Sequence, residues 1–303
     1  MKSLLAFLSL LVGLLGGAPS GAVEVRDESW TDAARQRGLP VRIRLPDGSG
    51  RAPTILFSHG LGGSVSGGRE WGEHWASQGF AVIHVQHPGS DESLWRDKPS
   101  GERLASLRSG AGVEQFLART ADIRFVVAEL ARRQSAGDPV ATRVDLARLG
   151  MSGHSFGAIT TLYLGGQRPP PGIADFLAPN LAESAFKAFL AFSPQVIGAD
   201  PAHQFSRFTR PVLLVTGTQD GSAAFGVTPE QRLIPFEAMP ATGNKYLLVV
   251  DDANHMFFNG EGRAGEGHAL VNAVSTAYWR AHLQDDGEAL RWLKARGGAF
   301  KSK

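Results

Sequence analysis

The chain has 303 residues, of which 43% are hydrophobic and 20% are charged, and 31 Lys and Arg against 29 Asp and Glu give a net charge of +2. These values are typical of a globular protein and exclude a disordered or collagen-like chain. The sequence contains no Cys, which excludes disulfides, thiolate metal sites and a Cys nucleophile. The basic residues are scattered and form no stripe that would bind nucleic acid.

The N-terminus has the order of a secretory signal. Lys2 precedes an apolar run at residues 4–15, and small residues follow up to Ala22. The run is about a dozen residues long, whereas a membrane-spanning helix needs roughly 20. We therefore expect a signal peptide over residues 1–22, cleaved after Ala22, and an exported protein in the periplasm or the medium. The alternatives are cleavage after Ala18, an uncleaved membrane anchor or a buried helix. No later segment is long enough to span a membrane.

Beyond residue 40, runs rich in β-branched and aromatic residues alternate with helical patterns. Several runs are apolar almost throughout, as is typical of strands covered on both faces. Apolar residues recur at helical spacing at 123–130 and 270–281. This alternation predicts an α/β fold, a single domain over residues 23–303 with a mostly parallel central sheet and helices on both faces. The expected strands are Val41–Leu45, Thr54–Ser58, Phe80–Gln86, Arg148–Ser152, Phe186–Ser193, Val212–Thr216 and Tyr246–Val250.

Two segments lie outside this pattern. Three consecutive prolines at 169–171 open an irregular stretch to about Ser184, which is either a lid insertion or a connector. The last residues, 297–303, have the composition of a frayed tail. We assign no function to either segment from the sequence.

Residues 153–157 read Gly-His-Ser-Phe-Gly and match G-x-S-x-G, a pattern that presents a nucleophilic Ser. Alone the match is weak, because a chain with 37 Gly contains such patterns by chance. Here a strand is expected before it and a helix start at 158–164 after it. That setting predicts Ser155 in a sharp turn at the carboxyl edge of the sheet, with the two glycines avoiding side-chain clashes. The alternative is a Gly-rich turn with a surface Ser.

A Ser hydroxyl is a poor nucleophile at neutral pH, so it needs a base, and an acid must orient that base. Four His follow Ser155 in the chain. His255 comes just past the last long strand, where a loop can bring its imidazole over the sheet edge. We therefore expect His255 to be the base. The others are expected at the surface: His203, His268 and His282.

The orienting acid should fall between the nucleophile and the base in the chain. Asp220 follows the expected strand 212–216 at its carboxyl end, beside the strand that leads to His255. We therefore expect Asp220 to be the acid. The alternatives are Asp251 and Asp252, which lie on the His loop itself and reach the imidazole less easily, and Asp200.

Negative charge on an attacked carbonyl needs backbone donors. One should be the N–H of Phe156, after the nucleophile, and the other the N–H of Leu61, in the glycine-rich loop 58–64. His59 lies in the same loop, where we expect it to make a structural hydrogen bond. The candidate substrate contacts are Gln195, from its place in the chain, and Phe225, from its closeness to Asp220.

The chain gives no sign of a cofactor. It contains no P-loop and no paired-His spacing for a metal, and its G-x-G-x-x-G match at 260–265 follows the His loop rather than a strand. We therefore expect no cofactor and no metal. The expected partner is a small-molecule or lipid ester, and the oligomeric state stays open.

The residues 57–63, Phe-Ser-His-Gly-Leu-Gly-Gly, together with the motif at 153–157, resemble the platelet-activating-factor acetylhydrolase branch of the α/β-hydrolases. Residues 73–79 and 87–91 look like its bacterial relatives, often labelled predicted dienelactone hydrolases. The resemblance covers roughly residues 30 to 285. It implies the α/β-hydrolase fold and a metal-independent serine esterase for carboxylic esters, with Ser155 as nucleophile and His255 as base.

Two departures from this pattern bear on the substrate. The animal acetylhydrolases carry the acid soon after the strand that follows the nucleophile helix, and residues 192–195 here read Phe-Ser-Pro-Gln, without a carboxylate. Asp220 has the position usual in dienelactone-hydrolase-like members, which typically use a Cys nucleophile that this chain lacks. The predicted activity is hydrolysis of short-acyl esters, including short-acyl or oxidised phospholipids. The alternatives are another acyl hydrolase, acting on an aromatic polyester or a peptide, and an inactive binding module.

Overall fold

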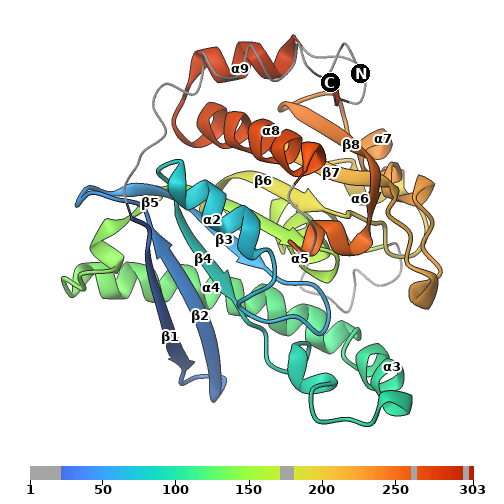
Figure 1. The fold of residues 1–303 in the computed structure, drawn as a ribbon, viewed down its shortest axis with the longest axis horizontal. Coiled ribbons are helices and arrows are strands. Elements are labelled where there is room, and N and C mark those ends of the chain that lie inside the picture. Colours follow the sequence, from blue (N-terminus) through green and yellow to red (C-terminus); the bar gives the residue numbers. More distant parts are fainter. Residues whose placement is uncertain (1–21, 171–180, 261–264, 296–299) are drawn as a thin grey trace.

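The computed structural model describes residues 22–170, 181–260, 265–295 and 300–303 (Figure 1). The predicted signal peptide lies, apart from Ala22, outside the described residues. Within the described ranges no helix is both long enough and apolar enough to cross a membrane. The strands are β1 Glu24–Asp32, β2 Arg37–Leu45, β3 Ala52–Ser58, β4 Ala81–Val85, β5 Val144–His154, β6 Phe186–Phe192, β7 Val212–Gln219, β8 Lys245–Asn254 and β9 Phe300–Ser302.

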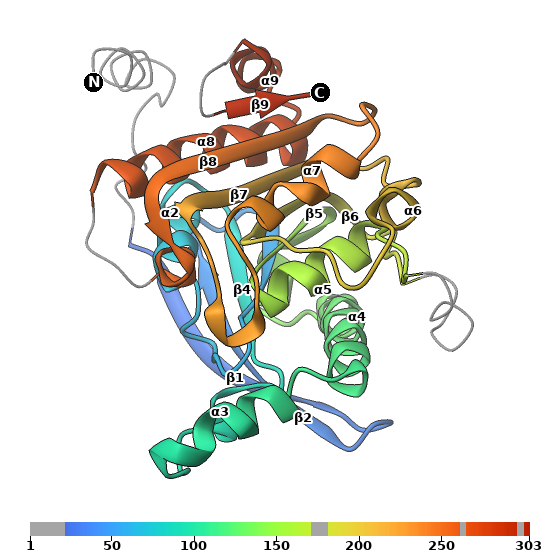
Figure 2. The same cartoon turned by 90° about the vertical axis from the view of Figure 1, so that its right-hand side faces the viewer.

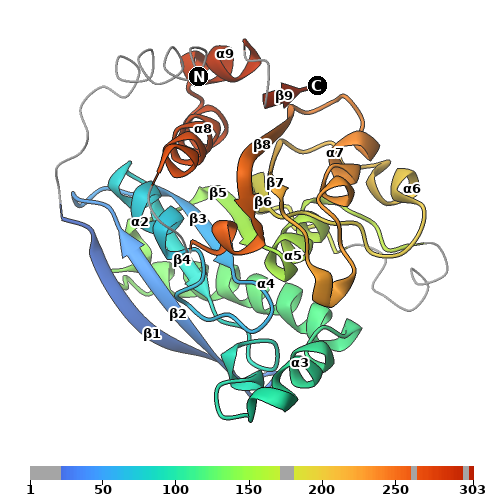
Figure 3. The ribbon, with the colours of Figure 1, turned by 45° about the vertical axis from the view of Figure 1, so that its right-hand side comes forward.

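These strands form a nine-stranded sheet in the order β1-β2-β4-β3-β5-β6-β7-β8-β9. The strands from β4 to β8 in this order pair in parallel, whereas β1, β2 and β9 pair antiparallel with their neighbours. Figure 3 shows β1 and β2 at one edge of the sheet and β9 at the other. The predicted α/β fold with a mostly parallel sheet is confirmed.

The α-helices are α2 Arg69–Ser77, α3 Ser100–Ser109, α4 Val113–Ser135, α5 Phe156–Gly165, α6 Pro201–Phe205, α7 Ile234–Ala238, α8 Glu266–Leu283 and α9 Gly287–Lys294. They cover both faces of the sheet, with α4 and α5 on one and α2, α8 and α9 on the other (Figure 2). Short 3-10 helices connect these elements: Glu92–Leu94, Ala141–Arg143, Ala223–Phe225, Glu230–Arg232 and His255–Asn259.

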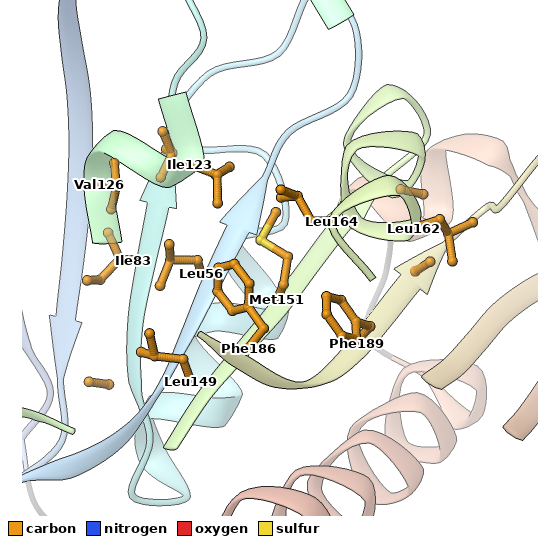
Figure 4. Close-up of a cluster of buried hydrophobic side chains, with 14 of the residues drawn as sticks. Leu56, Ile83, Ile123, Val126, Leu149, Met151, Leu162, Leu164, Phe186 and Phe189 are labelled. Atoms are coloured by element: carbon orange, nitrogen blue, oxygen red, sulfur yellow. The ribbon is translucent and has the colours of Figure 1, made fainter. Parts of the chain in front are cut away.

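Each face of the sheet carries its own hydrophobic core because successive strand residues point to opposite sides. In β3, Leu56 packs into the cluster under α4 and α5, while Ile55 and Phe57 pack into the cluster under α2 and α8. Figure 4 shows part of the first cluster, where side chains of the helices meet those of the central strands. The central strands are buried on both faces, which is why the sequence showed them as continuous apolar runs.

All seven expected strands are present, and two strands were missed. β1 is an edge strand whose largely exposed, charged residues give no apolar pattern. β9 lies within the predicted tail, so the prediction of fraying is wrong for residues 300–302. Phe300 is only 2% exposed and stacks on Tyr246, and backbone hydrogen bonds join Lys303 to Lys245.

The order of the strands determines where a site can form. The chain passes from β3 to β4 on one side, and β5 lies on the other side of β3. At such a switch point the loops that follow the two strands turn away from each other and leave a crevice at the carboxyl edge. The loop after β3 and the turn after β5 are the segments that carry Leu61 and Ser155.

Candidate active site

Ser155 occupies a strained turn between β5 and α5. Its backbone has φ 54° and ψ −113°, a conformation that residues other than Gly rarely adopt. A Cβ at position 153 would lie 2.4 Å from the carbonyl oxygen of Gly157, and one at 157 would lie 1.9 Å from that of Ser58. Both positions therefore require Gly, and the predicted strand–turn–helix setting of the motif is confirmed.

The structure brings Ser155, His255 and Asp220 into one hydrogen-bonded chain. Nε2 of His255 lies 3.0 Å from Oγ of Ser155, and Nδ1 lies 2.7 Å from Oδ1 of Asp220. The Asp220 side chain is fully buried and also accepts a hydrogen bond from Thr216 Oγ1 at 2.8 Å. A carboxylate, an imidazole and a hydroxyl in this order are the arrangement that activates a Ser for attack.

The other Asp and His residues considered in the sequence analysis are not part of this hydrogen-bonded chain. Asp251 and Asp252 are exposed in β8, and Oδ1 of Asp252 accepts from Gln219. Asp200 is the N-cap residue of α6, and its side chain accepts a hydrogen bond from the backbone N–H of His203. The prediction that His268 lies at the surface is wrong, since it is 3% exposed and stacks on Trp71. The two other His, His203 and His282, are partly buried.

The loop after β3 lies against Ser155, because a Cβ at Gly60 would approach the Cβ of Ser155 to 3.5 Å. Gly62 N donates to Ser90 O at 2.9 Å and Gly63 N donates to Gly60 O at 3.0 Å, which fixes the loop on both sides of Leu61. Among the described residues, the N–H groups of Leu61 and Phe156 have no hydrogen-bond acceptor. Both predicted oxyanion donors are therefore free to bind a ligand oxygen.

Arg119 of α4 contacts both the loop after β3 and Phe156, and the sequence analysis did not identify it. Its Nη2 donates to the carbonyl of His59 and its guanidinium lies 4.6 Å from the centre of the Phe156 ring. Nη1 donates to Ser90 Oγ at 2.9 Å, and the backbone oxygen of the same Ser90 accepts from Gly62 of the loop. Arg119 is fully buried, and burial lowers the pKa of its guanidinium. Its position in an apolar helical stripe with Phe116 and Ile123 was the available signal.

His59 makes the structural hydrogen bonds that were expected of it. Its Nε2 accepts from the backbone N–H of His87 at 3.0 Å, so its Nδ1 carries the proton and donates to Gly60 O at 2.6 Å. Burial, with the positive charge of Arg119, holds the pKa of His59 well below its usual value. A neutral His59 therefore stabilises the loop after β3 through two hydrogen bonds.

A second Ser–His–Asp chain lies beneath this loop. His87 bridges Ser58 Oγ and Asp122 Oδ2, each at 2.9 Å, and all three side chains are shielded from solvent. Burial lowers the pKa of His87 to about 4. These three residues have the geometry of a nucleophile site, but Ser58 is buried and no substrate can reach it. They therefore support the loop after β3.

His154, the variable residue of the motif, holds the loop that carries His255. Its Nε2 donates to the backbone oxygen of His255 at 3.0 Å, and the two rings lie 4.7 Å apart. Burial lowers the pKa of His154 well below its usual value, so the ring is neutral. The sequence pattern places no constraint on this residue, and the contact spans 101 positions.

Arg232 is a buried cation beside the Ser–His–Asp chain. Its Nη2 lies 3.2 Å from Nδ1 of His255, and its Nε donates to Asp220 O at 3.1 Å. Its Nη1 donates to Ser193 O at 3.1 Å and to Gln195 Oε1 at 2.9 Å. Burial lowers the pKa of Arg232, and the charge of Asp220 opposes that effect. No pattern in the sequence indicates a role for Arg232.

Two cavities meet at Ser155. The first, of about 380 Å³, is lined by both predicted substrate contacts, Gln195 and Phe225, and by Leu61. The second, of about 560 Å³, is lined by His255, and Leu61 and Phe225 border it too. Within the described part of the chain, no three Asp, Glu or His side chains are grouped so as to hold a metal ion.

No family model matches the chain. The chain is similar to esterase EstD of Thermotoga maritima, with 23% identity in an alignment of 274 residues that covers 75% of this chain. The chain spans about 60% of the length of this curated relative. The similarity to an esterase and the mixed sheet with helices on both faces fit an α/β-hydrolase.

Proposed function

We propose that the protein is a serine carboxylic-ester hydrolase. The observation that carries this proposal is the chain Ser155–His255–Asp220, with 3.0 Å and 2.7 Å between successive groups, in a strained turn at the switch point of the sheet. Two free backbone N–H groups beside the hydroxyl and the similarity to EstD support it. A fold by itself does not define an activity, so the proposal depends on this site.

In the first step, His255 accepts the proton of Ser155 as Oγ bonds to the ester carbonyl carbon. The N–H groups of Leu61 and Phe156 stabilise the negative oxygen that forms. The bond to the alcohol oxygen then breaks, and His255 gives its proton to the leaving alcohol. Asp220 keeps the imidazole in the tautomer with its proton on Nδ1 and stabilises the imidazolium.

In the second step, His255 accepts a proton from water, whose oxygen attacks the acyl-enzyme carbonyl carbon. The bond to Oγ breaks, the acid is released, and Ser155 regains its proton from His255. Every proton in this cycle passes through Nε2 of His255, which lies within hydrogen-bond distance of Ser155 Oγ.

The proposed substrates are short-acyl esters, including short-acyl or oxidised phospholipids, as the resemblance to the platelet-activating-factor acetylhydrolase branch and its dienelactone-hydrolase-like relatives implies. We also propose that the protein is exported through its N-terminal signal. A fusion of residues 1–30 to an export reporter tests this, and a reporter retained in the cytoplasm would contradict it. The alternative activities, on a polyester or a peptide, use the same residues.

A direct test is trapping of the nucleophile. A phosphonate ester that reacts with activated Ser should add one phosphonyl group to the protein, at Ser155. After proteolysis, the added mass should be found in the peptide that contains residues 153–157. His255→Ala should slow labelling by orders of magnitude. Labelling at another Ser, or equal labelling of the variant, would contradict the proposal.

A further inference from the structure

The two cavities that meet at Ser155 differ in their relation to the base. Ser155 lines both, but His255 lines only the larger one, together with its neighbour His154. A leaving alcohol must receive its proton from the base, so its oxygen must stand beside His255 Nε2. The alcohol part of an ester therefore faces the larger cavity, and the acyl part faces the smaller one.

The walls of the smaller cavity are mostly apolar, although Gln195, Ser222 and Arg232 also line it. Phe116, Phe156, Ile159 and Tyr163 line it and belong to one hydrophobic cluster of the protein. The rings of Phe116 and Tyr163 meet edge to face with centroids 4.6 Å apart, which makes a rigid wall. Two of the large hydrophobic residues exposed at the surface of the described chain, Val113 and Ile197, line this cavity and not the larger one. Such a surface takes a hydrocarbon or aryl group from water.

Tyr163 adds one polar group to this apolar space. Its hydroxyl has no hydrogen-bond partner among the described residues, and burial raises its pKa to about 12. The phenol is therefore neutral.

The larger cavity is lined by glycines, by polar groups and by apolar side chains, among them Trp95, Leu107 and Met256. It is bordered by the loop from Gly60 to Gly63 and by Ser64, Ser66, Arg69, Glu92 and Asn259. Ser66 and Arg69 are exposed, so this cavity is open to water. A wall that combines hydrogen-bonding groups with apolar side chains fits an alcohol that carries both polar and apolar parts.

We propose, on the basis of the proposed esterase function, that the smaller cavity selects the acyl group and the larger one the alcohol. The substrate class is an ester of an apolar acyl group with an alcohol that carries both polar and apolar parts. Ile159 sets the acyl specificity, because it lies one helical turn after Ser155 and lines only the smaller cavity. Ser66 is its counterpart, because it lines only the larger cavity.

The test uses two substrate series and variants on each side. The first series varies the acyl group of p-nitrophenyl esters from acetate to octanoate, and the second varies the alcohol of butyrate esters among ethanol, cyclohexanol and glycerol. Ile159→Phe should lower kcat/KM for octanoate relative to acetate by about tenfold, and Ile159→Ala should change this ratio in the opposite direction. Neither variant should change the order of the alcohols.

Ser66→Trp is the matched variant for the larger cavity. It should lower kcat/KM for the cyclohexanol and glycerol esters relative to the ethanol ester, and leave the acyl series in its wild-type order. Should Ile159→Phe fail to fold, Val113→Phe fills the same cavity from a position that is 55% exposed.

Reversed effects, with the Ile159 variants changing the alcohol series and Ser66→Trp the acyl series, would overturn the assignment while leaving the esterase function intact. Unchanged ratios in every variant would overturn it as well. Absence of hydrolysis by the folded wild-type protein on both series would instead refute the esterase function on which the assignment rests.

Discussion

Arg232 lies against His255, with its Nη2 3.2 Å from Nδ1 of the imidazole, at the point where Asp220 also contacts that ring. Its guanidinium donates three hydrogen bonds, to Ser193 O and Gln195 Oε1 after β6 and to Asp220 O after β7, and so joins the ends of these two strands beside the His loop. One buried side chain thus holds Asp220 and Gln195 of the smaller cavity, and Asp220 in turn contacts His255. Arg232 acts on the reaction through these residues and is a positioning residue.

Arg232→Met should lower kcat by about 10- to 100-fold, because displacement of catalytic groups by about 1 Å has an effect of this size. It should also lower the free energy of unfolding by about 3–5 kcal/mol, because the carbonyls and the carboxylate around it lose their donor. Rates measured well below the unfolding temperature separate the two effects. Arg232→Lys is the control, since it keeps a cation at this position. A wild-type kcat in folded Arg232→Met would refute the positioning role.

Asp220→Asn should lower kcat by about a thousandfold or more. An amide in place of the carboxylate presents a donor to Nδ1, so the imidazole adopts the tautomer that cannot accept the Ser155 proton. Asp251→Asn, on the same sheet edge but exposed, should keep a wild-type kcat. Steady-state kinetics on one activated ester distinguishes the two positions, and the opposite pattern would assign the acid to the His loop.

The protein should lose stability as the pH falls from 6.5 toward 4. Burial is the main cause that lowers the pKa of His87 to about 4 and that of His84 to about 3, and it also lowers the pKa values of His59 and His154. The unfolded chain binds protons to these His below about pH 6.5, whereas the folded chain does not. Each therefore contributes stability above that pH that is lost on acidification, by up to about 1.4 kcal/mol per pH unit.

Urea unfolding at pH 7.5, 6.0 and 5.0 measures this loss as a falling free energy of unfolding. An unchanged free energy over this range would show that the four His are accessible to protons in the folded state.

Phe300→Ala should destabilise the protein by about 3–5 kcal/mol, as is typical of a fully buried Phe. Phe300 is 2% exposed and pairs β9 with Leu248 of β8. Lys301→Ala, on the exposed side of the same strand, should change stability by less than about 0.5 kcal/mol. Equal melting temperatures for the two variants would mean that β9 does not pair stably in solution.

The sequence predicted those parts of the fold and site whose signals are local. The central strands are buried on both faces and therefore read as apolar runs, and the turn at Ser155 needs Gly at 153 and 157 for reasons of close contact. Asp220 and His255 could be placed because parallel strands end at one sheet edge. The distances that join them to Ser155 required the structure.

Other parts carried no local signal. Arg232 lies in a short 3-10 helix between strands, and its partners are 12 to 39 positions away in the chain. Arg119 supports the loop after β3 across 60 positions, and His154 holds the loop of His255 across 101. β9 is three residues long, too short for a periodic pattern, and its stability comes from Phe300 packing on Tyr246.

The most direct test of the central claim is hydrolysis of p-nitrophenyl esters from acetate to palmitate by the wild type and by Ser155→Ala. Ser152→Ala is the control, since Ser152 is buried three positions earlier in β5 and its hydroxyl has no hydrogen-bond partner in the described chain. The proposed site predicts hydrolysis of the shorter esters, a loss of several orders of magnitude in Ser155→Ala and little change in Ser152→Ala. Equal rates for Ser155→Ala and the wild type would contradict the assignment of the nucleophile and with it the proposed mechanism.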